Sequence, residues 1–313
     1  MGKSRIIKPN RPRKQHVISK FYLGQFADEK GSLFVYEAGK PIRKSVPLRE
    51  TTEKDLFEYK LPREDSRYQV EEMLSRLESL AGPIHAKLLN GVPCSNKDDI
   101  LVWAFFVAST FLRSRRVRNE LIVKSLASTD AEWLGNDHIR ETQYEIFTRF
   151  GKLFPFDEIA EAARRARNEY ENPAFRHAQA IRNSTSKLAF VLSQKHWQVV
   201  EAHELGFFAT CDAPILSFQL KGAQLFDGAG WQLPNVHVAL PISPRLIFLA
   251  SPPDAQWIPK FDARNTALMN LVVARFADHC VYADRESSEL AATLNAHART
   301  MVFGENAFKV SQL

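Results

Sequence analysis

Apolar residues recur at helical spacing from residue 66 onward. Residues three and four apart share one helix face, so this spacing predicts an amphipathic helix. Gly82-Pro83 lies inside the pattern and predicts a break or kink, because proline lacks the N–H donor and crowds the preceding turn. The apolar positions of the segment are Val70, Met73, Leu74, Leu77, Leu80, Ala81, Ile84 and Leu88.

A second helix is expected to begin at Ser95 or Asn96. Either residue can cap a helix N-terminus, and the two aspartates that follow complement the helix dipole. This helix continues through the apolar stretch 100–112, and residues 130–195 then read as charged, amphipathic helices. The middle third of the chain is therefore predicted to be a helical layer.

Short apolar runs separated by Gly and Pro replace this pattern after residue 195 and predict an antiparallel sheet. They cover residues 197–200, 207–210, 215–218, 236–240 and 246–249. The other predicted elements are a hairpin at 32–36 and 45–48, helices at 263–276 and 286–297, and strands at 280–283 and 308–310. Helices followed by strands indicate an α+β fold, with a helical layer from the first half packed on a mainly antiparallel sheet from the second half.

Composition places the chain among globular proteins of a reducing compartment. Its 313 residues are 45% hydrophobic, enough for a sizeable core, and its three cysteines are far apart. The positively charged start has no apolar run behind it, and the stretch 100–112 is too short to cross a bilayer. We expect a cytoplasmic protein without a membrane partner, built from a flexible basic arm (1–14) and a single α+β domain (15–313).

The net charge of +6 resides in the basic arm. Residues 1–14 hold six basic residues and no acid, which leaves 36 basic against 36 acidic residues in the remainder. Such an arm can bind phosphates and give salt-dependent contact with nucleic acid, for which Arg11, Arg13 and Lys14 are the candidates. The alternative is a solvated chain end without a ligand.

Several common enzyme signatures are absent from the sequence. It contains no phosphate-binding Gly-rich loop, no dinucleotide fingerprint, no H-E-x-x-H, no paired C-x-x-C and no G-x-S-x-G. A nucleotide cofactor is therefore unsupported, and the commonest zinc-hydrolase and serine-esterase classes are disfavoured.

A family resemblance begins at His16-Val-Ile-Ser-Lys-Phe-Tyr-Leu-Gly-Gln-Phe26. This segment resembles the opening of DUF4238, a bacterial family of unknown function whose members start with His-x-x-Pro-x-x-Tyr/Phe-Leu-x-x-Phe, although Ser19 stands where that family has proline. The resemblance spans about residues 15–285 and implies the limits of the fold rather than an activity. Its further matching segments, in chain order, are Leu33–Tyr36, Val70-Glu71-Glu72-x5-Glu78, Ala81–Pro83, Phe111–Arg115, Trp197, Phe208–Pro214 and Leu240–Pro244.

Polar residues within these segments suggest a candidate active site. If the fold gathers them, His16 can act as general acid or base, and Arg113 can clamp a phosphate. Glu78 and Asp212 can hold a divalent metal ion. With His16, Arg113 and Asp212 as catalytic residues, the set suits a metal-assisted phosphodiester hydrolase that acts on nucleic acid or a nucleotide.

Each of these residues also has a structural interpretation. His16 can bond a backbone group, Glu78 can belong to a solvated helix face, and Arg113 can complement a helix C-terminus. Asp212 can cap its own turn. One alternative function is a non-catalytic regulatory module that binds nucleic acid or protein through the arm, with the body as scaffold. Another is a protein–protein interaction partner, with exposed apolar residues of the middle helices as the interface.

Overall fold

Helices and antiparallel sheets build the chain, so the α+β prediction is confirmed. The structure is a computed structural model. It describes residues 14–54, 69–92, 94, 96–118, 135–170, 173–221, 224–227, 230–233, 235–255, 260–298 and 307–309.

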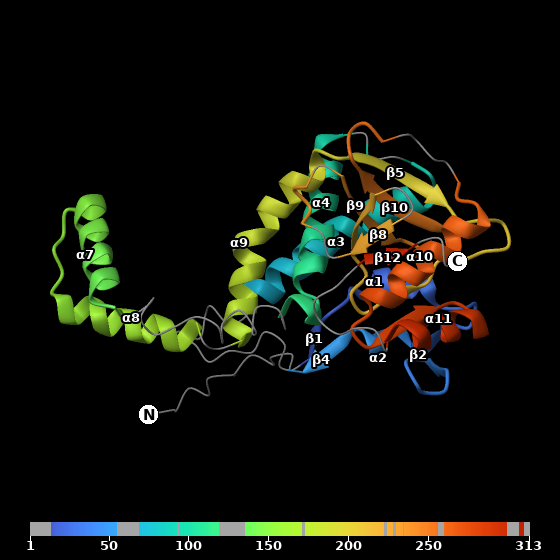
Figure 1. Cartoon of the computed structure of the whole chain (residues 1–313), viewed down its shortest axis with the longest axis horizontal. Coiled ribbons are helices and arrows are strands. Elements are labelled where there is room, and N and C mark those ends of the chain that lie inside the picture. Colours follow the sequence, from blue (N-terminus) through green and yellow to red (C-terminus); the bar gives the residue numbers. More distant parts are fainter. Residues whose placement is uncertain are drawn as a thin grey trace, which may run out of the picture.

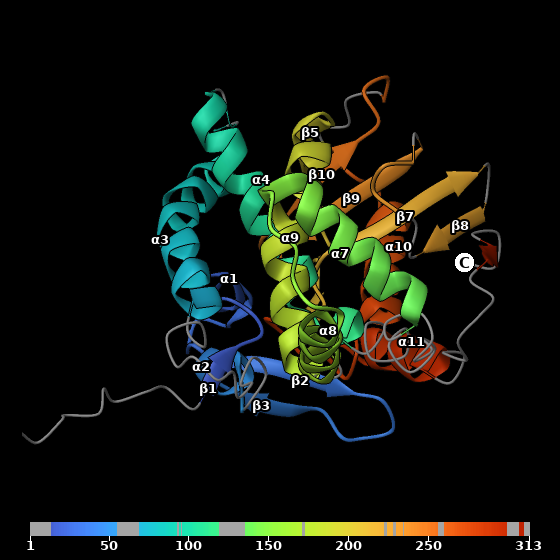
Figure 2. The ribbon, with the colours of Figure 1, turned by 90° about the vertical axis from the view of Figure 1, so that its left-hand side faces the viewer.

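Three long helices form the predicted helical layer. The apolar helix α4 (Lys97–Leu112) packs on both α3 (Gln69–Leu89) and α9 (Pro173–Ser193) (Figure 2). Asn96 caps α4 as predicted, because its side chain accepts a hydrogen bond of 2.7 Å from the N–H of Asp99.

Helix α3 continues through Gly82-Pro83, so the chain does not break there. The apolar stripe explains why. Ala81, Ile84 and Leu88 are buried before and after the proline, in the core that they share with α4. This burial offsets the cost of about 3 kcal/mol that proline imposes inside a helix.

A six-stranded antiparallel sheet lies against the helical layer. Its strand order is β12 (Ala307–Lys309), β8 (Gln224–Asp227), β7 (Leu216–Lys221), β9 (Val236–Pro241), β10 (Leu246–Ser251) and β5 (His196–Glu201).

Successive residues of this sheet point into two different cores, as the period of two in a strand requires. Val238 and Leu240 on β9 belong to the core on the helical side, whereas Ala239 belongs to the core on the other side. On β10, Phe248 belongs to the core on the helical side and Ile247 to the core on the other side. Both faces of the central strands are therefore buried.

A second antiparallel sheet joins the two halves of the chain. Its order is β3 (Arg43–Ser45), β2 (Leu33–Glu37), β11 (Cys280–Ala283) and β6 (Thr210–Cys211). The expected β2–β3 hairpin is present, but of the predicted partner strand 45–48 only Ser45 pairs. Pro47 starts the short helix α2 (Pro47–Glu50), a position that suits proline.

The N-terminal segment is fixed to the body by buried aromatic residues. Strand β1 (Lys14–His16) pairs with β4 (Thr52–Lys54), and α1 (Lys20–Leu23) and the 3-10 turn η1 (Gly24–Phe26) follow. The hydroxyl of Tyr22 forms a buried hydrogen bond of 2.6 Å with the hydroxyl of Thr210 on β6.

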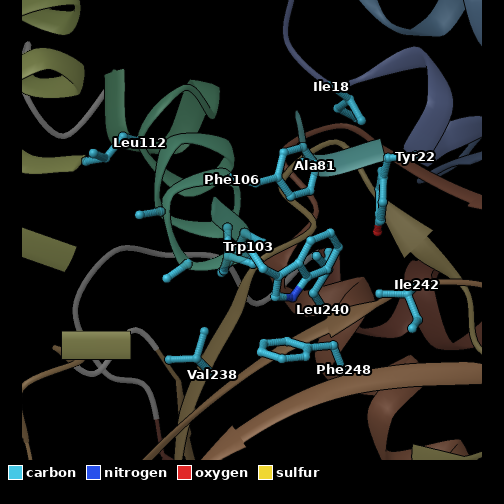
Figure 3. Close-up of a cluster of buried hydrophobic side chains, with 14 of the residues drawn as sticks. Ile18, Tyr22, Ala81, Trp103, Phe106, Leu112, Val238, Leu240, Ile242 and Phe248 are labelled. Carbon is cyan, nitrogen blue, oxygen red and sulfur yellow. The ribbon is translucent and has the colours of Figure 1, made fainter. Parts of the chain in front are cut away.

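Trp103 of α4 lies at the centre of the larger core, fully buried (Figure 3). Its ring stacks on Phe106 at 5.1 Å and meets the edge of Phe248 at 5.9 Å between centroids. Because Phe248 comes from β10, this contact joins the helical layer to the six-stranded sheet. On the other side of the sheet, α10 (Ala263–Phe276) packs on β6 and β7, and α11 (Ser288–Ala298) packs on α10 and β2.

Two helices stand away from this body. Figure 1 shows α7 (Asn136–Phe150) and α8 (Phe156–Tyr170) on the left, connected to the rest through α9. Their own core is small, with Ile139, Ile159 and Ala160 as its buried side chains. We call residues 136–170 the α7–α8 projection.

Candidate functional site

Five polar side chains from four elements meet beside the N-terminal segment. β1 supplies His16, the N-cap of α1 supplies Ser19, α3 supplies Glu71 and Glu78, and the C-cap of α4 supplies Arg113. The two glutamates are seven residues apart, which is about two helical turns, so they lie on the same face of α3. We call this group the N-terminal polar cluster.

Arg113 is the buried centre of this cluster, with an exposed fraction of 1%. Its guanidinium donates to Glu78 Oε1 at 2.6 Å and to the hydroxyl of Ser19 at 2.7 Å. The Ser19 hydroxyl in turn donates to the same Glu78 oxygen at 2.7 Å. These bonds close a ring that fixes the ends of α4 and α1 against α3.

His16 forms the accessible edge of the cluster. Its Nδ1 lies 3.6 Å from Oε1 of Glu71, and its side chain is 36% exposed. The interaction of the His16 imidazole N–H with the Glu71 carboxylate raises the pKa of His16 above its ordinary value, with the negative charges of Glu71 and Glu78 acting in the same direction. A half-exposed imidazole beside a carboxylate can take up or release a proton near neutral pH.

Asp212 occupies a different setting, directly after β6. Its carboxylate accepts three backbone hydrogen bonds, from Asp278 at 2.8 Å, His279 at 2.8 Å and Cys280 at 3.2 Å. Asp278 and His279 belong to the turn between α10 and β11, and Cys280 is the first residue of β11, so Asp212 anchors this connection. Burial, and then the nearby charge of Asp278, raise the pKa of Asp212 to about 7.

The structure thus brings His16, Glu78 and Arg113 into one cluster and holds Asp212 by other partners. A chain of contacts connects the two places, because the N–H of Arg116, three residues after Arg113, donates to Asp278 at 2.9 Å. Within the described ranges, no three His, Cys, Asp or Glu side chains are grouped in a way that could hold a metal ion. The catalytic and metal-binding assignments of these residues stay predictions.

The nucleic-acid residues expected in the basic arm fall almost entirely outside the described part of the chain. Arg11 and Arg13 lie outside it, and Lys14 is the first residue of β1, opposite Lys54. Their role also stays a prediction.

Sequence analysis did not identify one member of the cluster, and it predicted a second feature only as exposed apolar residues of the middle helices. Ser19, at the position where the family pattern has proline, is a member of the polar cluster, and that departure from the pattern was the available signal. The second is a group of exposed apolar side chains on the α7–α8 projection. Its signal was the spacing of Tyr144, Phe147 and Phe150, which recur every three residues along α7.

A groove runs between the two helices of the projection, with a volume of about 860 Å³. Its apolar part includes Ile146, Phe154 and Ala162. The charged and polar residues that line it are His138, Thr142, Asp157, Glu158, Glu161 and Arg165.

Comparison with known proteins gives a family and no activity. No curated protein and no solved structure matches the chain significantly. No helix in the described ranges is both long and apolar enough to span a membrane. The sequence profile of DUF4238, described as a protein of unknown function, matches residues 14–287. This match covers most of the chain, which therefore belongs to the DUF4238 family.

Proposed function

We propose that this chain is a protein-binding module, in which the α7–α8 projection contacts the partner and the α+β body holds the projection in place. One observation carries the proposal: large apolar side chains are concentrated, in exposed positions, between residues 144 and 154. Their exposed fractions are Tyr144 69%, Phe147 48%, Phe150 65%, Leu153 72% and Phe154 39%.

The concentration separates this group from ordinary surface residues. Single exposed apolar residues are normal on any protein and need no explanation. Among the described side chains, however, five aromatic residues are exposed, and four of them lie on the projection, with Phe190 of α9 as the fifth. Aromatic side chains are enriched in protein–protein interfaces, where they bury a large area at a small cost in conformational entropy.

Site-specific photo-crosslinking tests this proposal. A photoreactive phenylalanine analogue replaces Phe150 in cells that make the protein, and the matched control carries the analogue at Phe190, which is 66% exposed. We expect a discrete cross-linked protein from position 150 that disappears when Tyr144 and Phe147 are both changed to Ser. Equal cross-linking from positions 150 and 190 would contradict the proposal.

The environment of the His16 imidazole supports a second candidate function, the predicted phosphodiester hydrolase. The supporting observation is its half-exposed imidazole, 3.6 Å from Glu71, in a cluster where Arg113 and Glu78 are fixed by hydrogen bonds. In this candidate Arg113 and Asp212 act as positioning residues, because both side chains are buried.

Cleavage of RNA and DNA by the purified protein, with and without magnesium or manganese, tests the second candidate. A general acid or base contributes roughly 10²- to 10⁴-fold, so the His16→Ala variant should lose at least about 100-fold. Glu72→Gln is the matched control, because Glu72 lies on α3 with 65% exposure and pairs with Arg76. Equal rates in wild type, His16→Ala and Asp212→Asn would remove this candidate.

A further inference from the structure

One stripe of α8 contributes four of the residues that line the groove of the α7–α8 projection, beside Asp157, Ile159 and Ala163 of the same helix. Glu158, Glu161, Ala162 and Arg165 all line it, and they follow each other at intervals of three, one and three residues. This is the spacing of a single helix face. Ala162, in the middle of the stripe, has the smallest side chain.

Charge is distributed unevenly along the same helix. Asp157, Glu158 and Glu161 stand in the first half of α8, and Arg164 and Arg165 follow them, all five exposed. Glu161 pairs with both arginines within the helix. A stripe in which acidic residues precede arginines is also complementary to an antiparallel copy of itself. Two-fold symmetric contacts require this kind of self-complementary surface.

We infer that the partner of the projection is a second copy of this chain, with the two α8 helices packed antiparallel; the inference rests on the protein-binding function proposed above. A two-fold axis between Glu161 and Ala162 places Glu158 of each copy opposite Arg165 of the other. The small side chain of Ala162 at the axis lets the helices approach to the usual separation of about 8–10 Å.

Burial of apolar surface supplies most of the free energy of this contact. Exposed ion pairs contribute only about 0.2–1 kcal/mol each, so Glu158 and Arg165 fix the direction of packing rather than its strength. The apolar side chains that line the groove, among them Ile146, Phe154 and Ala162, are the surface that this contact covers in each copy.

Two charge-reversal variants of α8, studied alone and as a mixture, test the inference. Glu158→Lys/Glu161→Lys makes the stripe basic, and Arg164→Glu/Arg165→Glu makes it acidic. Sedimentation equilibrium of the full chain in low salt should give twice 35.7 kDa for the wild type. Each variant alone should dimerise at least about tenfold more weakly, equivalent to about 1.4 kcal/mol. An equimolar mixture of the two should restore a 1:1 heterodimer, because opposite charges then face each other.

Two controls keep the result interpretable. Glu141→Lys/Glu145→Lys makes the same charge change on exposed positions of α7 that do not line the groove, and it should dimerise like the wild type. Phe154→Ser keeps the charges of α8 and should weaken the dimer, because Phe154 lines the groove. Circular dichroism of every variant checks that the helices are intact.

A wild-type protein that stays monomeric at about 100 µM, or charge variants that dimerise as well as the wild type, would overturn the second-copy inference. If Phe150 then still cross-links to a different protein, the protein-binding function stands and only the identity of the partner is wrong. If position 150 cross-links to nothing and the wild type is monomeric, both proposals fail together.

Discussion

The N-terminal polar cluster and the α7–α8 projection both depart from the usual distribution of polar and apolar groups. The cluster buries a charged side chain, whereas the projection exposes apolar side chains. In the cluster, the charged guanidinium of Arg113 is buried in the body, and its two terminal nitrogens donate to Glu78 and Ser19. On the projection, large apolar side chains such as Phe150 face solvent. Buried charge is tolerated where hydrogen bonds compensate it, whereas exposed apolar surface gains free energy only when something covers it. The first region therefore serves the fold, and the second is suited to binding.

Removing the buried cation should have the largest effect on stability. Arg113→Met leaves Glu78 without its positively charged partner, and breaking one side of a buried ion pair costs about 3–5 kcal/mol. Urea unfolding monitored by circular dichroism measures the loss. Arg76→Met is the matched control, since Arg76 is 78% exposed and pairs with Glu72 on the same helix. It should cost less than about 1 kcal/mol. Similar losses in the two variants would mean that Arg113 does not organise the fold.

Asp212→Asn should have the next largest effect. The amide presents one acceptor oxygen to a site with three backbone donors, so at least one N–H loses its partner, at about 1–3 kcal/mol. The expected loss appears as a lower urea midpoint at pH 7.

The same variant changes the pH dependence of stability. Because the folded-state pKa of Asp212 is about 7, above its ordinary value of 3.8, folding takes up a proton between these limits. This contribution is fully present below about pH 4 and is lost as the pH rises through 7. Wild-type stability should therefore fall across this window relative to Asp212→Asn, and parallel stability curves for the two proteins would contradict the assignment.

His16 should give a smaller, local effect. Its pKa is raised chiefly by the hydrogen bond with Glu71, so the stabilising interaction is present below the ordinary pKa near 6.5 and fades as the pH rises through the folded-state value. In Glu71→Gln the imidazole pKa, followed by NMR titration, should fall toward 6.5. With 36% of the side chain exposed, the accompanying change in stability should be below about 1 kcal/mol. An unchanged imidazole pKa would exclude the pairing with Glu71.

The smallest effect on stability is expected on the projection. Phe150→Ser removes an exposed ring, so the free energy of unfolding should change by less than about 0.5 kcal/mol. Association should nevertheless weaken, because the ring belongs to the surface that we propose is covered. A large loss of stability in this variant would place Phe150 in the core of the body, and would remove the contrast between the two regions.

Local elements of secondary structure could be predicted from the sequence. The N-cap at Asn96, the helix over 263–276 and the strand over 280–283 agree with the structure, because capping and apolar periodicity act over a few neighbouring residues. The α+β class follows from their order along the chain. Family membership was likewise visible in short segments, beginning at His16.

Tertiary structure alone decided which distant groups meet. In the folded chain the early strand β2 pairs with the late strand β11, and α3 continues through Pro83. Ser19, Glu78 and Arg113 form hydrogen bonds with each other, whereas Asp212 has other partners. The tertiary structure also leaves α7 and α8 outside the body, so that Phe147 and Phe150 remain exposed. The physical reason is that burial and hydrogen bonding depend on the packing of whole layers, whereas the pattern along the chain records only which face of each element is apolar.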